Sequence, residues 1–245
     1  VPRGDVEIVV TTIGYGIARK AVPVTEGMPE VEIPLRSVQS LPGIATGDDF
    51  YASFATRGSG FSTVGFYLDG VLMSAPFHTI RDVNDGYWLT LVNGDVVDSI
   101  TLLSGSAPAR YGDRTGSVLG LKLREGSREE FFGRASLGAT GVYATLEAPL
   151  GGAKKTSWLL SARKSYLDYV LDRLDTSGFV LGYYDVTARL THHPSDSQTL
   201  ALGLLHGRSH WRNTEEERGP ISDDTADAGT DLLTLQHRFL PSPHT

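Results

Sequence analysis

Apolar and polar residues alternate along much of the second half of the chain. Within residues 142–148 every second residue is apolar, with Tyr143, Thr145 and Glu147 between them. The same period of two returns at 185–190, 199–204 and 233–239, with His237 as an exception on the apolar side. Because successive side chains of a β-strand point to opposite faces, the pattern predicts a sheet with one apolar and one polar face.

Two kinds of protein contain such a sheet. A soluble sandwich buries the apolar face against a second sheet, whereas an outer-membrane barrel turns it to lipid. Aromatic residues stand toward the predicted strand ends, as an interfacial belt requires: Trp158, Tyr166, Tyr169, Tyr183, Tyr184 and Trp211. The connections predicted at 151–156 and 193–197 are short and the one at 209–229 is long and acidic, which is typical of a barrel. The alternation alone leaves both structures open.

The first half of the chain has shorter strand-like runs, separated by glycine and proline. β-Branched and apolar residues predict strands at 6–12, 65–72, 96–103 and 117–123. A helical turn is predicted at 35–41, where Leu35, Val38 and Leu41 share one face and Pro42 ends the helix. The change of pattern near residue 127 predicts a small mixed domain followed by a separate sheet.

Composition and charge limit the kinds of membrane span, partner and site that the chain can have. The longest apolar runs, such as 156–162, are far shorter than the roughly 20 residues of a membrane-spanning helix, but a membrane-spanning strand needs only about 9 to 11. The net charge of -7 argues against a nucleic-acid partner. The absence of cysteine excludes disulfides, thiolate metal sites and cysteine nucleophiles.

We find no pattern of catalytic or metal-binding residues. His192 and His193 are adjacent and point to opposite faces of a strand, and His206 and His210 do not belong to a His-Glu-x-x-His sequence. The acidic stretch after Glu215 lacks the glycine-centred spacing of an EF-hand and is interpreted as a solvated loop. The chain has no nucleotide fingerprint and no nucleophile elbow. We therefore expect no enzyme activity, no cofactor and no metal.

Four motifs in order resemble the plug domain of TonB-dependent outer-membrane receptors. They are SVQSLPGI at 37–44, FATRGSG at 54–60, VGFYLDGV at 64–71 and the long block VVDSITLLSGSAPARYGDRTGSVLGLKLREG at 96–126. The resemblance implies a mixed α/β plug domain followed by antiparallel transmembrane β-barrel strands that form an incomplete barrel, in a mainly β chain. The domains expected are an amino-terminal segment at 1–34, the plug at 35–127 and the first barrel strands at 128–245.

The matching positions are the candidate site residues. They are Arg57, Gly58, Leu68, Asp69, Gly70, Arg110, Tyr111, Gly112 and Gly116. In the family, the arginine corresponding to Arg57 anchors plug to barrel; an exposed loop arginine is the alternative. Independently of the family, Asp69 and Gly70 are a strong signal for a tight type I′ turn, because both tolerate positive φ.

The amino-terminal run VEIVVTTIG at 6–14 resembles a TonB box, with Glu7, Ile8, Val9, Val10 and Thr11 as candidate TonB contacts. An unpaired strand there would add to a sheet edge of the periplasmic partner. The alternative is the last strand of a small β-sandwich that precedes the plug. The run SARKSYLDYVLDRL at 161–174 resembles early barrel regions of receptors that have a carboxypeptidase-regulatory-like extension.

The resemblance implies energised uptake across the Gram-negative outer membrane, driven by TonB, with outer-membrane lipid around the barrel. The substrate would be scarce, such as a siderophore, cobalamin or a glycan. Barrels of this family have about 22 strands, and residues after 127 supply five or six, so we expect the chain to be a piece of a longer receptor. A soluble β-rich binding or adhesion module and an inactive truncated fragment are the rivals. Exposure of the apolar sides of the later strands would favour the receptor.

Overall fold

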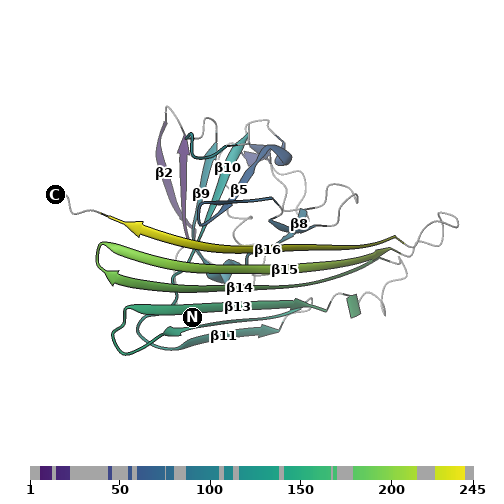
Figure 1. Ribbon diagram of the computed structural model, residues 1–245. Helices are drawn as coiled ribbons and strands as arrows, with labels where there is room; N and C mark the ends of the chain where they lie inside the picture. The colour runs from purple at the N-terminus through teal and green to yellow at the C-terminus, as the bar shows by residue number, and fades with distance from the viewer. Residues whose placement is uncertain are drawn as a thin grey trace. The chain divides into compact units, whose positions relative to one another are not determined.

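The computed structural model of the chain divides into two compact units (Figure 1). Among the described residues, the first unit ends at Arg124 and the second begins at Glu125. The residues described are 6–12, 15–22, 44–45, 55–56, 60–74, 76–79, 87–104, 108–112, 116–137, 141–166, 168–169, 179–213 and 224–240. Within these ranges, no helix is long and apolar enough to cross a membrane.

The first unit is built on a six-stranded mixed sheet with the order β2-β1-β9-β10-β5-β6. Its strands are β1 (Val6–Thr12), β2 (Tyr15–Val22), β5 (Gly65–Leu68), β6 (Val71–Met73), β9 (Val97–Ser104) and β10 (Ser117–Leu123). Strand β1 runs parallel to β9 and β5 runs parallel to β10, whereas the other neighbours are antiparallel. Two short hairpins accompany the sheet: β3 (Ile44–Ala45) with β4 (Ala55–Thr56), and β7 (Phe77–Thr79) with β8 (Tyr87–Thr90).

Apolar residues of the central strands form the core of the first unit. All four residues of β5 are buried, as are Ile100 and Leu102 on β9 and Leu119 on β10. Phe66 on β5 lies edge-on to Phe77, with ring centroids 5.1 Å apart. Short 3₁₀ turns at Phe61–Thr63 and Gly94–Val96 lead into β5 and β9. The core therefore holds β5, β9 and β10 in a fixed register.

The second unit is one antiparallel sheet whose strands follow each other in sequence order. They are β11 (Phe132–Leu137), β12 (Gly141–Pro149), β13 (Thr156–Ser165), β14 (Phe179–Ser195), β15 (Gln198–Asn213) and β16 (Asp224–Phe239). Figure 1 shows β13 to β16 running side by side. With 17, 16 and 16 residues, the last three strands exceed the roughly 9 to 11 residues that cross a bilayer.

The polarity of this sheet is the reverse of that in a soluble sandwich. One row of cross-strand partners joins Trp158, Leu190, Leu202 and Leu235, and its three leucines are 38%, 43% and 79% exposed. The opposite face is buried and mostly polar, and the side chains there with no exposed surface include Ser157, Ser161, Asp185, Thr187 and Thr191. The apolar sides of these strands are thus exposed, which is the outcome expected of a lipid-facing sheet.

The four strands predicted in the first half of the chain are confirmed, and two of them differ in extent. The segments 6–12 and 117–123 form strands with those bounds. The strand predicted at 96–103 is shifted by one residue to 97–104, and 65–72 divides into β5 and β6 around the turn at Asp69 and Gly70. The long connection predicted at 209–229 is wrong at both ends, because β15 continues to Asn213 and β16 begins at Asp224. The helical turn predicted at 35–41 lies outside the described residues.

Candidate functional site

The Leu68-Asp69-Gly70 motif forms the turn between β5 and β6. Asp69 and Gly70 have φ values of 50° and 84°, as a type I′ turn requires. The Asp69 side chain has a second role, because its Oδ1 accepts a hydrogen bond from the Leu123 amide at 3.0 Å, while the Asp69 amide donates to the Leu121 carbonyl at 2.8 Å. The turn is therefore tied to the end of β10, which a plain hairpin would not be.

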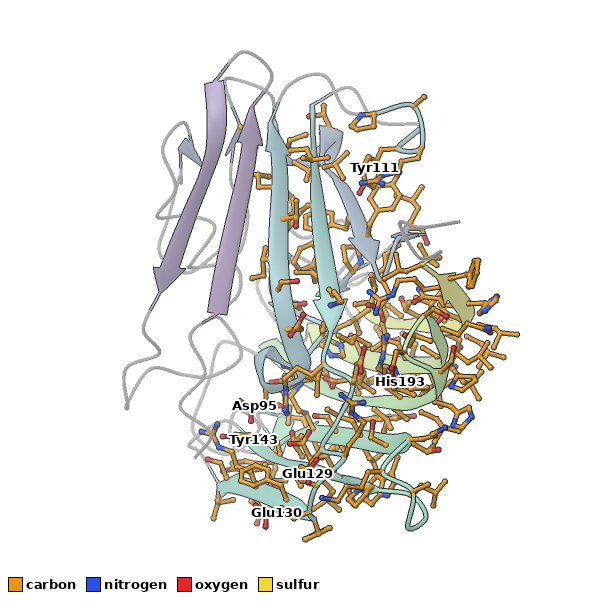
Figure 2. The ribbon with its side chains drawn as sticks, turned by 90° about the vertical axis from the view of Figure 1, so that its left-hand side faces the viewer. Asp95, Tyr111, Glu129, Glu130, Tyr143 and His193 are labelled. Atoms are coloured by element: carbon orange, nitrogen blue, oxygen red, sulfur yellow. The ribbon has the colours of Figure 1, made fainter. Side chains whose placement is uncertain are left out.

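The Arg110-Tyr111-Gly112 motif lies against β5. The Tyr67 hydroxyl donates to the Gly112 carbonyl at 3.2 Å, and the rings of Tyr67 and Tyr111 meet edge to face at 4.9 Å. The Arg110 guanidinium stands 4.7 Å from the centre of the Tyr111 ring, within the range of a cation–π interaction. Tyr111 is labelled in Figure 2. Aromatic contacts thus hold this otherwise exposed segment beside the sheet.

Gly116 precedes β10 in a place where a side chain does not fit. A Cβ atom there would lie 2.2 Å from Thr63 Oγ1, 3.0 Å from Thr63 Cβ and 3.2 Å from the Thr63 carbonyl oxygen. The Gly116 amide donates to that same carbonyl at 3.2 Å. One residue on, the Ser117 hydroxyl donates to Thr56 Oγ1 at 3.1 Å in a buried contact. The motif glycine therefore permits a close approach of two chain segments.

The two remaining groups of candidate residues have different outcomes. Arg57 and Gly58 lie outside the described residues, so the anchoring role of Arg57 stays a prediction.

Glu7 to Thr11 form β1, whose main chain is paired with β2 on one side and with β9 on the other. This differs from the expectation of an unpaired segment or of a separate sandwich, because the β-branched run joins the sheet of β9 and β10.

A buried ion pair lies on the polar face of the second unit. Arg163 Nη2 is 2.7 Å from Asp185 Oδ2, and Arg163 Nε donates to both carboxylate oxygens at 3.0 and 2.9 Å. The two residues are direct partners on β13 and β14, and their side chains are 3% and 0% exposed. Such burial is tolerated when each charge is paired and hydrogen-bonded. No local motif marks this pair in the sequence, since it depends on the register of two strands.

Charged residues follow the leucines on the apolar face of β15 and β16. His206 lies opposite Asp231 and His210 opposite Asp227, with Nδ1 to Oδ1 distances of 2.5 and 2.7 Å, and Arg208 Nη2 reaches Asp231 Oδ2 at 2.8 Å. A hollow of about 400 Å³ opens there, and its lining includes Lys164, Asp168, Tyr184, Arg208, His210 and Asp227. Within the described ranges, no group of three or more histidine or acidic side chains could hold a metal ion.

Comparison with known proteins finds a family model that matches part of the chain and solved structures whose fold resembles most of it. Residues 30–118 match the family model described as the TonB-dependent Receptor Plug Domain. A search of curated proteins found no match. Several solved structures are similar, and the likeness to each concerns the fold, because the identities are low.

Three of these structures each cover more than four fifths of this chain. A mutant of the ferric enterobactin receptor PfeA from Pseudomonas aeruginosa is 18% identical, with a TM-score of 0.57 over 87% of this chain and 36% of the receptor. The outer membrane transporter YddB from Escherichia coli is 14% identical, with a TM-score of 0.56 over 84% of this chain and 34% of the transporter. FpvA of P. aeruginosa, bound to heterologous pyoverdines, is 13% identical, with a TM-score of 0.53 over 82% and 29%. The chain thus spans about a third of the length of these proteins.

Proposed function

We propose that this chain forms the plug and part of the barrel wall of a TonB-dependent transporter in the Gram-negative outer membrane. Its residues 30–118 match the plug-domain family model, which supports the proposal. The first unit would block the pore and the second unit would be its wall. Transport in such a receptor makes and breaks no bond in the substrate. The energy would come from TonB, which pulls on the plug from the periplasmic side.

The observation that carries this proposal is the reversed polarity of the second unit. Leu202, Leu204, Leu233 and Leu235 are 42 to 79% exposed on one face, while charged and hydroxyl side chains are buried on the other. Full burial of one leucine is worth about 1.5 to 3 kcal/mol, so a continuous apolar face of this kind is costly in water. In a bilayer the same face contacts acyl chains, and the polar face lies inside the barrel.

For the substrate, we propose an iron chelate of the siderophore class. Support comes from two of the similar structures, a ferric enterobactin receptor and FpvA with bound pyoverdines. Cobalamin and glycans are the other candidate substrates. The described residues contain no set of side chains that distinguishes among these three.

TonB is the proposed energy-coupling partner, and Glu7 to Thr11 are the proposed contacts. Because β1 is paired on both sides, TonB can pair with it only after β1 leaves β2 or β9. In this proposal the six-stranded sheet is opened from its amino-terminal side when TonB binds.

The test is amide hydrogen exchange of the full chain in detergent, with and without the carboxy-terminal domain of TonB. We expect the amides that face β1 on β2 or on β9 to exchange faster when TonB is present, because the strand that β1 leaves loses its partner. Val9→Pro should weaken TonB binding by about tenfold, since proline cannot donate a strand hydrogen bond, and Val9→Ala serves as the matched control.

Three results are distinguishable. Binding that leaves β2 and β9 unchanged would place the TonB contact outside β1 and refute these five residues. Equal weakening by the proline and alanine variants would mean that the side chain of Val9 is recognised, instead of its main chain. Failure of the chain to bind TonB at all would contradict the proposed function and favour a soluble binding module.

A further inference from the structure

The two residues at which the units meet along the chain are each held by two hydrogen bonds. Within the first unit, the Arg124 amide donates to the Val96 carbonyl and Arg124 Nε to the Asp95 carbonyl, both at 2.8 Å. Within the second unit, Ser157 Oγ donates to the Glu125 carbonyl at 2.7 Å. The Glu125 side chain makes the fourth contact, because its Oε2 is 2.8 Å from His193 Nε2.

Gly126 brings the main chain still closer to the sheet. Its φ is +86°, and a Cβ atom on it would lie 2.7 Å from the Trp158 carbonyl oxygen and 3.3 Å from Leu159 Cβ. A side chain at this position would therefore collide with the main chain of β13, in a backbone conformation that disfavours any residue but glycine. The start of the second unit lies directly on β13.

His193 lies on β14 and contacts this segment through Glu125. Its amide donates to the Lys155 carbonyl at 2.8 Å, and its Nδ1 is 3.4 Å from Thr199 Oγ1 on β15. The charged groups around it are Glu125, Lys155, whose Nζ donates to the Pro194 carbonyl at 3.4 Å, and Arg238 of β16, whose Nη2 donates to Thr199 Oγ1 at 3.5 Å. Among the described residues, Glu125 is the acidic group that contacts the imidazole, and Lys155 and Arg238 donate to other acceptors. His193 is labelled in Figure 2.

We propose that Glu125 and His193 form a proton-dependent latch that positions the junction segment on the sheet of the second unit. With a charged imidazole, the contact is an ion pair in which the side chain of Glu125 is only 27% exposed and that of His193 only 19%. With a neutral imidazole, the same atoms keep a weaker hydrogen bond. The latch is therefore stronger when the imidazole is protonated than when it is neutral.

The latch gives the plug domain a fixed end. If TonB pulls on the amino-terminal side of the first unit, the load reaches the second unit through Arg124 and Glu125, and the latch keeps the junction in place while the preceding strands open. This consequence rests on the proposed function. The latch itself rests on the contacts of Glu125 and Gly126 and is tested without TonB.

The experiment is hydrogen exchange of the full chain in detergent, measured as protection factors so that the intrinsic pH dependence of exchange is removed. We expect the amides of Arg124 and His193, which donate to the Val96 and Lys155 carbonyls, to be about three- to fivefold better protected at pH 5.5 than at pH 8 in the unaltered chain, the range of a partly exposed ion pair. Glu125→Gln and His193→Gln should each remove this difference. His237→Gln, which changes an exposed histidine on β16, should leave it intact.

Each outcome decides the proposal. A difference that disappears in both latch variants and persists in the His237→Gln control supports the latch. Protection that is equal at both pH values in the unaltered chain overturns it, and this measurement holds even if the variants fail to fold. A pH dependence that survives in Glu125→Gln also overturns it, because another group would then be responsible. None of these results depends on whether TonB binds the chain, so the proposed function is judged separately.

Discussion

Gly116 and Asp69 show how single motif residues hold the first unit together. Gly116 lets the start of β10 approach Thr63, and Asp69 joins the β5–β6 turn to the Leu123 amide. The type I′ turn could be predicted from Asp69 and Gly70 alone, because positive φ is a local property. The contact of Asp69 with Leu123 could not, because it joins residues 54 positions apart.

We predict that Gly116→Ala destabilises the chain by about 1 to 3 kcal/mol, the usual range for overpacking. The Thr63 hydroxyl can rotate away from a new Cβ atom, but the Thr63 Cβ and carbonyl oxygen, at 3.0 and 3.2 Å, cannot. The measurement is the free energy of unfolding from urea titration in detergent.

Gly112→Ala is the matched control for this change. No atom lies within 4 Å of a Cβ built on Gly112, and its φ is not in the positive region, so its free energy of unfolding should change by less than about 0.5 kcal/mol. Equal effects of the two alanine substitutions would contradict the steric role assigned to Gly116.

At the scale of single strands, alternation predicts which face a residue occupies, but it does not predict register. On β12, Thr145 and Glu147 are buried and Val142 is exposed, as the pattern of polar and apolar positions indicated. The pairing of Arg163 with Asp185 requires the register of β13 against β14, which no property of either strand specifies by itself. The ion pair was therefore not predicted from the sequence.

The alternation also does not predict where β15 ends and β16 begins, for a related reason. Beyond Leu204 the outward face of β15 changes from leucine to His206, Arg208 and His210, so the contrast between apolar and polar positions disappears. The strand continues because Asp231 and Asp227 of β16 stand opposite the two histidines. Cross-strand charge pairs of this kind support pairing where apolar contacts end.

Single and double substitutions of Arg163 and Asp185 should change the free energy of unfolding by different amounts. Removing one partner leaves a buried charge without its counter-ion. Arg163→Met or Asp185→Leu alone should therefore lower the free energy of unfolding by about 3 to 5 kcal/mol. The double variant should cost less than either single variant, because no charge then remains unbalanced. A double-mutant cycle from urea unfolding measures this difference, and additive effects of the two substitutions would show that the pair is not coupled.

At the scale of the whole molecule, the chain combines two sheets that bury opposite kinds of side chain. The sheet of the first unit has an apolar core, whereas the sheet of the second unit exposes its leucines and buries its polar side chains. Among the described strands of the second sheet, β11 and β16 are each paired on one side only. A sheet inserted in a bilayer must have its edges paired, so the proposed function requires partner strands for both.

The central claim is that the exposed apolar face of the second unit contacts lipid, and spin-label accessibility tests it most directly. The chain contains no cysteine, so Leu202→Cys and Ala201→Cys each provide a single labelling site, at a 43% exposed and a 5% exposed position on opposite faces of β15. In lipid vesicles we predict that a nitroxide at residue 202 collides with oxygen, which dissolves in the acyl region, far more often than with a water-soluble nickel chelate, whereas the label at 201 shows no such preference. Greater collision with the nickel chelate at residue 202 would contradict the account, because the leucine face would then lie in water.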